Sequence, residues 1–360
     1  MSVYTKPLFL EYNKAIEMIH RIEVIQMALD KIIMKNFSVF SDMEMPLSSG
    51  INVFIGSNGT GKTQLLKAVY GCCELTEERR DSFIACFQLN AKTKSLARDI
   101  NVPRCHFSLH SNRQEAKIVS NHMLGVSGEN TSRISYENSI FLQKVNAVYL
   151  PVKDMLTHSR GLLAMAQKYT DFPFDKTLLD SVDRASRWGL KEPPLLARKV
   201  LPVLEQLIDG RVMLDSDEFY IVKQNGRKVN FELEAEGLKK IGILWQLLMN
   251  ETISEGTVLL WDEPEANLNP EFLPMIADCL LELSRADVQI LLSTHSYVLA
   301  KYLEIRAQKT DAISFHSLYK NPCGLVCDEQ NRSFGTLQHN AIMTAFEALM
   351  DEIYAEKVGE

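Results

Sequence analysis

Short apolar runs and longer segments of helical spacing alternate along this chain. Apolar runs bounded by polar residues predict buried strands, and apolar positions three and four residues apart predict helices that cover them. The predicted strands lie at 28–40, with a turn at Lys35-Asn36, and at 51–55, 82–88, 106–109, 147–151, 258–262 and 288–293. The predicted helices lie at 64–70, 241–249 and 270–283. At 360 residues the chain suits one large α/β domain with an inserted lobe, or two domains that share a core.

The pattern changes to helical spacing between residues 155 and 208, where Pro173 and Pro193-Pro194 break it into short helices. This segment predicts an inserted helical lobe. A hairpin is expected after it, with strands at 219–223 and 228–233. They are joined through Asn225-Gly226, a dipeptide that favours a tight β-turn.

A last helix is predicted near the end of the chain, over residues 340–357. It places Ile342, Phe346, Leu349 and Ile353 on one face. Such a face suits either docking to another protein or packing on the chain's own core.

Residues 56–63 read G-S-N-G-T-G-K-T, a complete phosphate-binding loop between a predicted strand and a predicted helix. Glycines let the backbone turn so that its N–H groups point at phosphate oxygens, the Lys62 ammonium bridges the terminal phosphates, and the Thr63 hydroxyl ligates Mg²⁺. The start of the following helix adds a favourable dipole for an anion. The residues expected to hold the nucleotide are Gly56, Asn58, Gly59, Thr60, Gly61, Lys62, Thr63 and Gln64.

Three further segments carry candidate chemistry. Asp262 and Glu263 end an apolar strand. Asp262 is therefore expected beside the phosphate loop, where it can hold Mg²⁺ through water, and Glu263 is expected to polarise an attacking water. His295 ends the next strand along the chain, where it can sense the γ-phosphate of a nucleotide. Gly237 stands at a predicted helix entrance, whose free N–H groups suit an anion.

Composition narrows the function classes. A net charge of −7 argues against a generally basic nucleic-acid coat. Basic residues outnumber acidic ones between Arg79 and Arg133, which leaves open a local face for nucleic acid or an acidic partner beside the alternative of a solvated surface. No apolar run reaches the length of a membrane span and the N-terminus lacks a signal pattern, so a cytoplasmic protein without membrane contact is expected.

The seven cysteines are scattered and odd in number, which fits a reducing compartment. Cys72-Cys73 are adjacent, and Cys323 with Cys327 has loose ligand spacing, but neither has a second ligand pair. Core thiols are favoured over metal ligands.

The order of the phosphate loop, glycine entrance, Asp-Glu strand and histidine strand resembles the ABC/SMC-type ATPases over nearly all of residues 28–302. Three segments look more narrowly like the small soluble ATPases related to the OLD family, many of which act in bacterial defence against phage beside a separate effector. They are A-E-G-L-K-K at 235–240, L-W-D-E-P-E-A-N-L-N-P at 260–270 and T-H-S-Y at 294–297.

This resemblance implies an α/β P-loop NTPase fold of the ABC-ATPase type, with a mixed sheet core, an inserted helical lobe and a β-hairpin. It divides the chain into four parts. The first part of the ATPase core, with the phosphate loop, would occupy residues 1–154, and the helical lobe 155–210. The second part of the core, with the signature helix, the Asp-Glu strand and the histidine strand, would occupy 211–305, and a C-terminal extension 306–360.

The resemblance also implies roles for matching residues. Lys62 and the loop amides would hold the β and γ phosphates of ATP, and Thr63 and Asp262 would hold Mg²⁺. Glu263 would be the catalytic base and His295 the γ-phosphate sensor. Asn267 belongs to the segment that would cross a dimer interface, and Gly237 would present the signature helix to ATP held by the partner subunit. ATP is therefore expected to be hydrolysed between two copies, in a head-to-tail homodimer or a higher oligomer.

Two departures from the family's pattern matter. Glu236 stands at the position of the signature serine, where its carboxylate would lie near the γ-phosphate and repel it unless a cation or a local shift intervenes. Slow hydrolysis is therefore expected. Gln88, at the end of the predicted strand 82–88, is the candidate for the family's glutamine, here assigned to the metal site. A surface glutamine is the alternative reading.

Three functions compete. The chain is the ATPase of a defence or toxin-antitoxin-like complex that controls a separate nuclease or toxin, or an SMC-like DNA repair head, or a transporter's nucleotide-binding subunit. The insert is too short for SMC arms, and a transporter's Ser-Gly-Gly signature is absent, which favours the first function. Residues 296–360 are too few for the nuclease domain of an OLD protein, and Asp215 and Asp217 suit a hairpin loop, so no intrinsic nuclease activity is expected.

Overall fold

A computed structural model describes residues 28–76, 79, 81–87, 96–99, 102, 104–111, 114–124, 130–137, 145–169 and 172–358. Its centre is a six-stranded sheet in the order β14-β13-β3-β12-β11-β7, in which only the edge strand β14 runs antiparallel to its neighbour. The strands are β3 (Ile51–Gly56), β7 (Ala147–Leu150), β11 (Val258–Asp262), β12 (Gln289–Ser293), β13 (Ile313–Lys320) and β14 (Val326–Asn331). The carboxyl ends of β3, β11 and β12 therefore meet at one edge of the sheet.

The central strands are buried on both faces, which explains their continuous apolar runs. Alternate residues of β3 point to opposite sides. Val53 and Ile55 belong to one hydrophobic cluster, and Phe54 belongs to the other. Because β3 packs on both faces, it holds the start of the loop at 56–63 in place.

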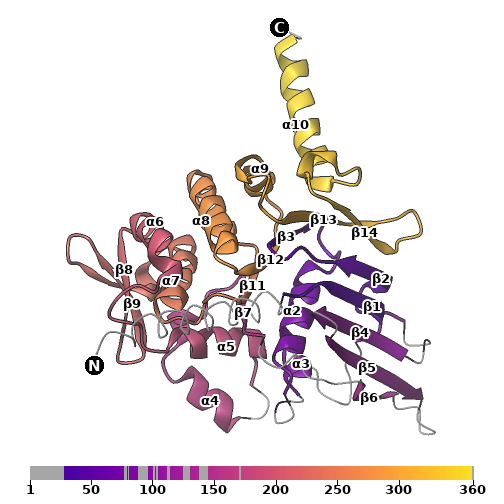
Figure 1. Cartoon of the computed structure of the whole chain (residues 1–360), viewed down its shortest axis with the longest axis horizontal. Coiled ribbons are helices and arrows are strands. Elements are labelled where there is room, and N and C mark those ends of the chain that lie inside the picture. The colour runs from indigo at the N-terminus through magenta and orange to yellow at the C-terminus, as the bar shows by residue number, and fades with distance from the viewer. Residues whose placement is uncertain are drawn as a thin grey trace, which may run out of the picture.

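A second sheet, antiparallel throughout, has the order β2-β1-β4-β5-β6. Helix α2 (Lys62–Cys73) shares a hydrophobic core with this sheet and with the Phe54 face of the central sheet, and Figure 1 shows it beside both. The strands are β1 (Lys31–Phe37), β2 (Phe40–Pro46), β4 (Arg104–Ser111), β5 (Gln114–Leu124) and β6 (Asn130–Glu137).

The opposite face of the central sheet carries the helices and a three-stranded sheet in the order β10-β9-β8. The longer helices are α7 (Glu236–Met249), α8 (Leu273–Arg285) and α9 (Tyr297–Arg306). The predicted helical segment forms α4 (Leu162–Lys168), α5 (Lys176–Ala185) and α6 (Leu201–Leu207), with short 3-10 turns η1 (Leu156–His158) and η2 (Leu196–Lys199). The strands are β8 (Gly210–Asp215), β9 (Glu218–Lys223) and β10 (Lys228–Asn230).

Two predictions near the N-terminus were wrong. The first hairpin turns at Ser38-Val39, not at Lys35-Asn36. Asn36 adopts a left-handed φ of 50° inside β1, where its amide donates to the carbonyls of Asp99 and Arg104. Asn36 therefore does not form the turn. It lies within the strand and makes hydrogen bonds to a distant segment of the chain.

The second error is the strand at 82–88. Its described part contains a short helix, α3 (Ser82–Ala85). Phe83 packs against Gly71 of α2 and against the rings of Phe37 and Phe107. A short apolar run fits a strand or a helix equally well. Here the packing of this segment on α2 favours the helix.

Two predicted elements differ at their bounds. The helix predicted at 241–249 begins earlier, at Glu236, so Gly237 lies in its first turn. The second strand of the Asn225-Gly226 hairpin ends at Asn230, because 231–233 forms a 3-10 turn, η3 (Phe231–Leu233), that buries Phe231. Asp215 and Asp217 flank the β8–β9 turn, which confirms the hairpin-loop interpretation.

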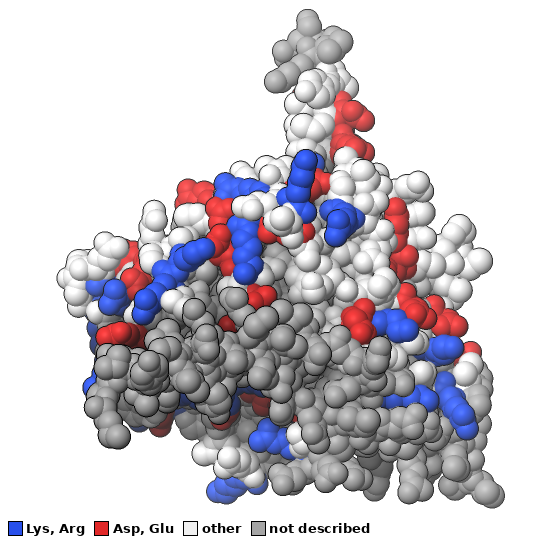
Figure 2. Space-filling view, viewed as in Figure 1, with Lys and Arg blue, Asp and Glu red and all other residues white. Residues whose placement is uncertain are grey.

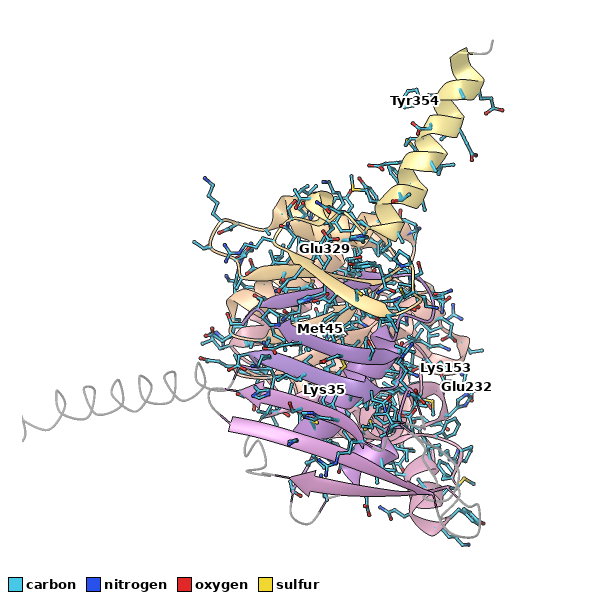
Figure 3. All side chains as sticks on the ribbon, turned by 90° about the vertical axis from the view of Figure 1, so that its right-hand side faces the viewer. Lys35, Met45, Lys153, Glu232, Glu329 and Tyr354 are labelled. Carbon is cyan, nitrogen blue, oxygen red and sulfur yellow. The ribbon has the colours of Figure 1, made fainter. Side chains whose placement is uncertain are left out.

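The last helix, α10 (Ala341–Val358), projects from the body of the molecule. Figure 3 shows Tyr354 near its tip, away from the other elements. Packing on the chain's own core holds only for the start of this helix, where the Phe346 ring stacks on Tyr297 with centroids 4.2 Å apart. Leu349 and Ile353 are 50% and 37% exposed, so the predicted apolar face is largely uncovered.

Buried thiols are confirmed for Cys72, Cys73, Cys86, Cys105 and Cys279, but the prediction was wrong for Cys323, which is exposed, and Cys327 is only half-buried. Burial raises the pKa of Cys105 and of Cys279 to about 12, so both stay protonated. Within the described residues, no cluster of three or more His, Cys, Asp or Glu side chains suits a metal ion. None of the helices in the described part combines the length and apolar character needed to cross a bilayer.

Candidate nucleotide-binding site

The phosphate loop connects β3 to α2 at the carboxyl edge of the central sheet. Gly56 and Gly61 have φ values of 146° and 92°, which L side chains rarely adopt. A Cβ on Gly56 would lie 2.2 Å from the Leu318 carbonyl oxygen, and one on Gly61 would lie 2.6 Å from Val39 Cγ2. Gly59 also has a positive φ, of 76°, but open space surrounds its Cβ position. The loop is therefore packed against the protein at Gly56 and Gly61 and open at Gly59.

Lys62 is folded into this loop. Its Nζ donates to the carbonyl oxygens of Gly56, at 2.8 Å, and Ser57, at 3.1 Å. Burial lowers the pKa of Lys62, while the nearby carboxylates of Glu263 and Asp262 act in the opposite direction. Thr60 donates to the Ser57 carbonyl at 2.9 Å, whereas Asn58 is exposed. The ammonium is thus held at the floor of a loop whose open side suits a polyphosphate.

Oxygen ligands meet beside the loop. Thr63 Oγ1 lies 3.2 Å from Asp262 Oδ1, although 199 residues separate them in sequence. Asp262 Oδ1 also accepts a hydrogen bond from the Ser293 hydroxyl, and Oδ2 accepts one from Tyr149 OH at 3.2 Å. Hydroxyl and carboxylate oxygens are the ligands Mg²⁺ prefers, so the donor set fits that ion.

Glu263 and His295 form the next pair. His295 Nε2 lies 3.5 Å from Glu263 Oε1, and both side chains are about one third exposed, at 35% and 32%. Burial lowers the pKa of His295, and the positive charge of Lys62 adds to this effect while Glu263 opposes it. Glu263 has a left-handed φ of 48°, and its carbonyl accepts a hydrogen bond from Lys240 Nζ at 3.0 Å. A neutral histidine and a carboxylate therefore stand together at the strand ends.

The glycine entrance of α7 packs against the loop that follows β11. A Cβ on Gly237 would lie 2.4 Å from the Asn267 carbonyl oxygen, so this close approach requires glycine. Asn267 is exposed and has a left-handed φ of 64°. Glu236 has a 55% exposed side chain, and its carboxylate pairs with Lys239 Nζ at 2.7 Å. A cation does therefore stand beside Glu236, as the charge argument required.

The predicted roles of Gln64 and Gln88 stay predictions. Gln64 is at the start of α2, where its amide oxygen accepts a hydrogen bond from Ser38 of the antiparallel sheet. Gln88 lies outside the described residues, as does much of the segment from Arg79 to Arg133, so its role stays a prediction. Figure 2 shows basic and acidic side chains intermixed on the visible described surface.

Sequence reasoning missed four residues. Tyr149 and Ser293 hold Asp262, while Lys240 and Glu265 hold the Glu263 and His295 segments. Glu265 Oε1 accepts hydrogen bonds from Thr294 Oγ1 at 2.7 Å and from the His295 backbone N–H at 2.8 Å. A tyrosine inside an apolar strand was an available signal, because a buried phenol needs a hydrogen-bond partner. Glu265, a third carboxylate only three residues after Asp262, was a second such signal.

Glu265→Ala is expected to lower the free energy of unfolding by about 2 kcal/mol, because it leaves the Thr294 hydroxyl and the His295 N–H without their hydrogen-bond acceptor. Burial raises the pKa of Glu265, and Glu265→Gln retains an acceptor oxygen without the charge. Glu265→Gln is therefore expected to lose less stability than Glu265→Ala. Urea denaturation measures both, with the exposed Glu255→Ala as control. Equal stability of Glu265→Ala and this control would show that the two hydrogen bonds contribute nothing.

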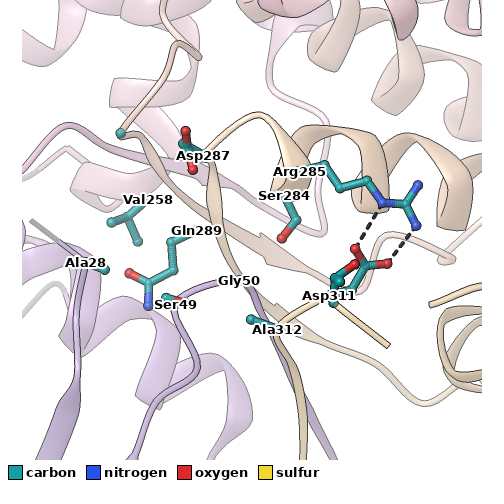
Figure 4. Close-up of a pocket in the computed structure, with 12 residues that line it drawn as sticks. Ala28, Ser49, Gly50, Val258, Ser284, Arg285, Asp287, Gln289, Asp311 and Ala312 are labelled. Atoms are coloured by element: carbon teal, nitrogen blue, oxygen red, sulfur yellow. Dashed lines mark hydrogen bonds and ion pairs between the residues drawn. The ribbon is translucent and has the colours of Figure 1, made fainter. Parts of the chain in front are cut away.

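A surface recess lies at the opposite, amino ends of the strands (Figure 4). Its lining includes Gly50, Gln289 and an ion pair between Arg285 and Asp311, with Nη2 and Oδ2 2.6 Å apart. None of the phosphate-loop residues lines it. The recess is therefore separate from the nucleotide site.

Comparisons with known proteins show the family of the chain. The family model described as "AAA domain, putative AbiEii toxin, Type IV TA system" matches residues 51–301, which include every motif described above. The DNA replication and repair protein RecF of Cytophaga hutchinsonii is 26% identical over 209 residues, covering 51% of this chain and 54% of that protein. RecF of Pediococcus pentosaceus is 26% identical over 152 residues, covering 41% and 37%. The chain thus spans about half the length, or less, of these curated relatives.

The chain is also similar to solved structures. The Smc head domain of Pyrococcus furiosus, with an extended coiled coil and bound to the C-terminal domain of ScpA, superposes with a TM-score of 0.50 at 13% identity. That comparison covers 90% of this chain and 99% of the other. The SMC head domain of Thermotoga maritima gives a TM-score of 0.44 at 16% identity, covering 84% and 99%.

The predicted fold class is confirmed, since the chain has the P-loop fold of SMC heads and ABC-type ATPases, with a mixed α/β core. The family model covers well over half of the 360 residues. The protein belongs to the AAA-domain family described as putative AbiEii toxin, Type IV TA system.

Proposed function

We propose that this ATPase of the ABC/SMC/RecF type is a nucleotide-controlled switch, whose ATP-bound dimer holds a separate nuclease or toxin in check in bacterial defence against phage. The observation that carries the proposal is the arrangement at the sheet edge. Lys62 lies in the phosphate loop, and Thr63 of the same loop meets Asp262. At the entrance of α7, where Gly237 packs against Asn267, the exposed residues Glu236 and Asn267 form a second surface of the same chain.

The phosphate loop supplies one half of a composite site. Lys62 and the loop amides would bind the β and γ phosphates of ATP, and the oxygens of Thr63 and Asp262 would hold Mg²⁺. When bound, this ion would neutralise charge on the phosphates. Glu263 would accept a proton from the attacking water, and His295, 3.5 Å away, would orient the Glu263 carboxylate and contact the γ-phosphate.

A second copy would supply the other half. The α7 entrance is held firmly within its own chain, by Gly237 against Asn267 and by Lys240 on the Glu263 carbonyl. A shift of Glu263 on nucleotide binding would therefore be passed to the surface that faces the partner. This coupling supports an assembly that forms with ATP and is released after hydrolysis.

Slow hydrolysis remains part of the proposal. Glu236 adds a negative charge at the surface that would approach the partner's ATP, and Lys239 offsets it. Because the Glu236 side chain is 55% exposed, water screens this pair. The remaining repulsion would slow assembly and turnover without preventing them, which suits a switch that stays set for a long time.

The experiment that tests the effector role uses the product of the adjacent gene. That product is expected to arrest growth when expressed alone and to be silenced by co-expression of this chain. Lys62→Ala should lose the silencing, while the exposed Lys153→Ala should retain it. If the neighbour is harmless alone, or if Lys62→Ala silences it as well as the native chain does, the effector role is wrong.

A second candidate function has its own support. The RecF relatives, named for DNA replication and repair, favour a DNA-directed ATPase. ATP hydrolysis by the purified chain, measured with and without gapped duplex DNA, separates the two functions. A large stimulation by DNA, without any effect of the chain on its genetic neighbour, would favour the DNA-directed function.

A further inference from the structure

Helix α10 presents an apolar stripe that the rest of the chain does not cover. Leu349 is 50% exposed, Ile353 37% and Tyr354 66%. Leu349 and Ile353 lie one turn apart on one face, as anchors in helix-in-groove contacts do, and Tyr354 lies on the adjoining side of the helix. Large exposed apolar groups of this kind mark an interaction surface more often than they mark a solvated one.

The same helix is acidic. Residues 341–358 contain four acidic residues, Glu347, Asp351, Glu352 and Glu356, and one basic residue, Lys357. All four are exposed, and Figure 2 shows acidic side chains along the described part of the projecting helix. Two copies of α10 placed side by side would therefore bring like charges together, which disfavours pairing of the helix with itself.

A second uncovered apolar surface lies on the helical lobe. We call residues 187–199, between α5 and α6, the Trp188 loop. Trp188 is 90% exposed, Leu195 81% and Leu190 43%. The loop is nevertheless anchored, because the Leu190 N–H donates to the Met249 carbonyl at the end of α7 at 3.0 Å. Its apolar side chains are thus presented from a fixed backbone.

The Trp188 loop has the opposite charge to α10. It contains four basic residues, Arg187, Lys191, Arg198 and Lys199, and one acidic residue, Glu192. Arg187 pairs with Asp183, and Lys199 pairs with Glu282, both through exposed side chains. Among the described residues, neither Lys191 nor Arg198 has a carboxylate within ion-pair distance. The loop therefore has positive charge available for an acidic partner.

We propose that α10 of one copy docks on the Trp188 loop of a second copy. The two surfaces match in both respects, apolar anchors and opposite charge. The helix cannot reach the loop of its own chain, because its base is fixed by the Phe346–Tyr297 stack and by Asn340, and it leaves the body away from α5 (Figure 1). An 18-residue helix extends about 27 Å in that direction.

Such a contact joins two different surfaces, so it gives a reciprocal dimer or a ring where the rotation closes, and an open filament where it does not. None of the nucleotide-site residues belongs to α10 or to the Trp188 loop. The contact is therefore expected without ATP, and it goes beyond the proposed function and does not depend on it.

The test uses the full chain carrying Lys62→Ala, with EDTA and without nucleotide, so that ATP-driven assembly cannot contribute. Sedimentation velocity over a range of protein concentrations is expected to show reversible association. The helix variant Asp351→Lys with Glu352→Lys should associate about tenfold more weakly, and so should the loop variant Lys191→Glu with Arg198→Glu. Combining the four changes should restore association, because the charges are then exchanged. The exposed Lys309→Glu serves as control.

Tryptophan fluorescence gives an independent readout. Trp245 and Trp261 are 6% and 1% exposed, so a blue shift on association reports Trp188, and it should vanish in Trp188→Phe. Circular dichroism melting confirms that each surface variant folds. A chain that stays monomeric at all concentrations overturns the proposal. So does unchanged association of either charge variant, or failure of the four-fold variant to recover.

Discussion

Lys62→Ala is expected to weaken ATP binding about a hundredfold, the largest effect on ATP affinity of any single substitution in this site. Lys62 is the cation at the floor of the phosphate loop, where its Nζ touches two carbonyl oxygens and lies near three carboxylates. Removing it leaves the negative field of Asp262, Glu263 and Glu265 facing the incoming phosphates. Titration with a fluorescent ATP analogue in the presence of Mg²⁺ measures the change.

Lys153→Ala is the matched control, because Lys153 is an exposed lysine outside the site (Figure 3). It should bind ATP within a factor of about two of the native chain. If Lys62→Ala binds ATP as tightly as this control, then the loop does not hold the phosphates in the expected way. Circular dichroism melting of Lys62→Ala shows whether weaker binding comes from lost structure instead.

Glu263→Gln is expected to lower the rate of ATP hydrolysis about a hundredfold to a thousandfold while leaving ATP affinity within a few fold. Glutamine has nearly the same shape and can still contact His295, but it cannot accept a proton from water. Its effect therefore reports proton transfer and not packing. Phosphate release under saturating ATP measures the rate.

The same variant should trap a nucleotide-bound dimer, because binding continues while hydrolysis stops. Mass photometry with and without ATP measures this, and Glu255→Gln is the control at an exposed carboxylate. A mass that does not depend on ATP in Glu263→Gln would count against an ATP site shared between two copies. A native hydrolysis rate would show that another group acts as the base.

The order of residues predicted most of the candidate nucleotide site. A strand, glycine loop and helix dictate how backbone N–H groups are presented, and this geometry is local to residues 51–70. Asp262, Glu263 and His295 were also placed correctly at strand ends. Parallel strands bring their carboxyl ends to one edge, so a motif at the end of each buried run must lie near the others.

Other features depended on long-range packing. Asn36 looked like a turn residue, and 82–88 looked like a strand, because local patterns do not include the carbonyls of Asp99 and Arg104 or the surface of α2. Tyr149, Lys240 and Glu265 became part of the site only when distant segments met. Their hydrogen bonds to Asp262, to the Glu263 carbonyl and to the His295 N–H join positions far apart in sequence.

By itself, the sequence determined the phosphate loop, the carboxylates at the strand end and the expectation of an ATPase, because these depend on residue type and short spacing. Only the tertiary structure decided that Lys239 stands beside Glu236, that Gly237 packs against Asn267, and that the apolar face of α10 is left uncovered. The reason is physical. Backbone geometry within a motif is local, whereas burial and charge compensation depend on which surfaces the whole chain brings together.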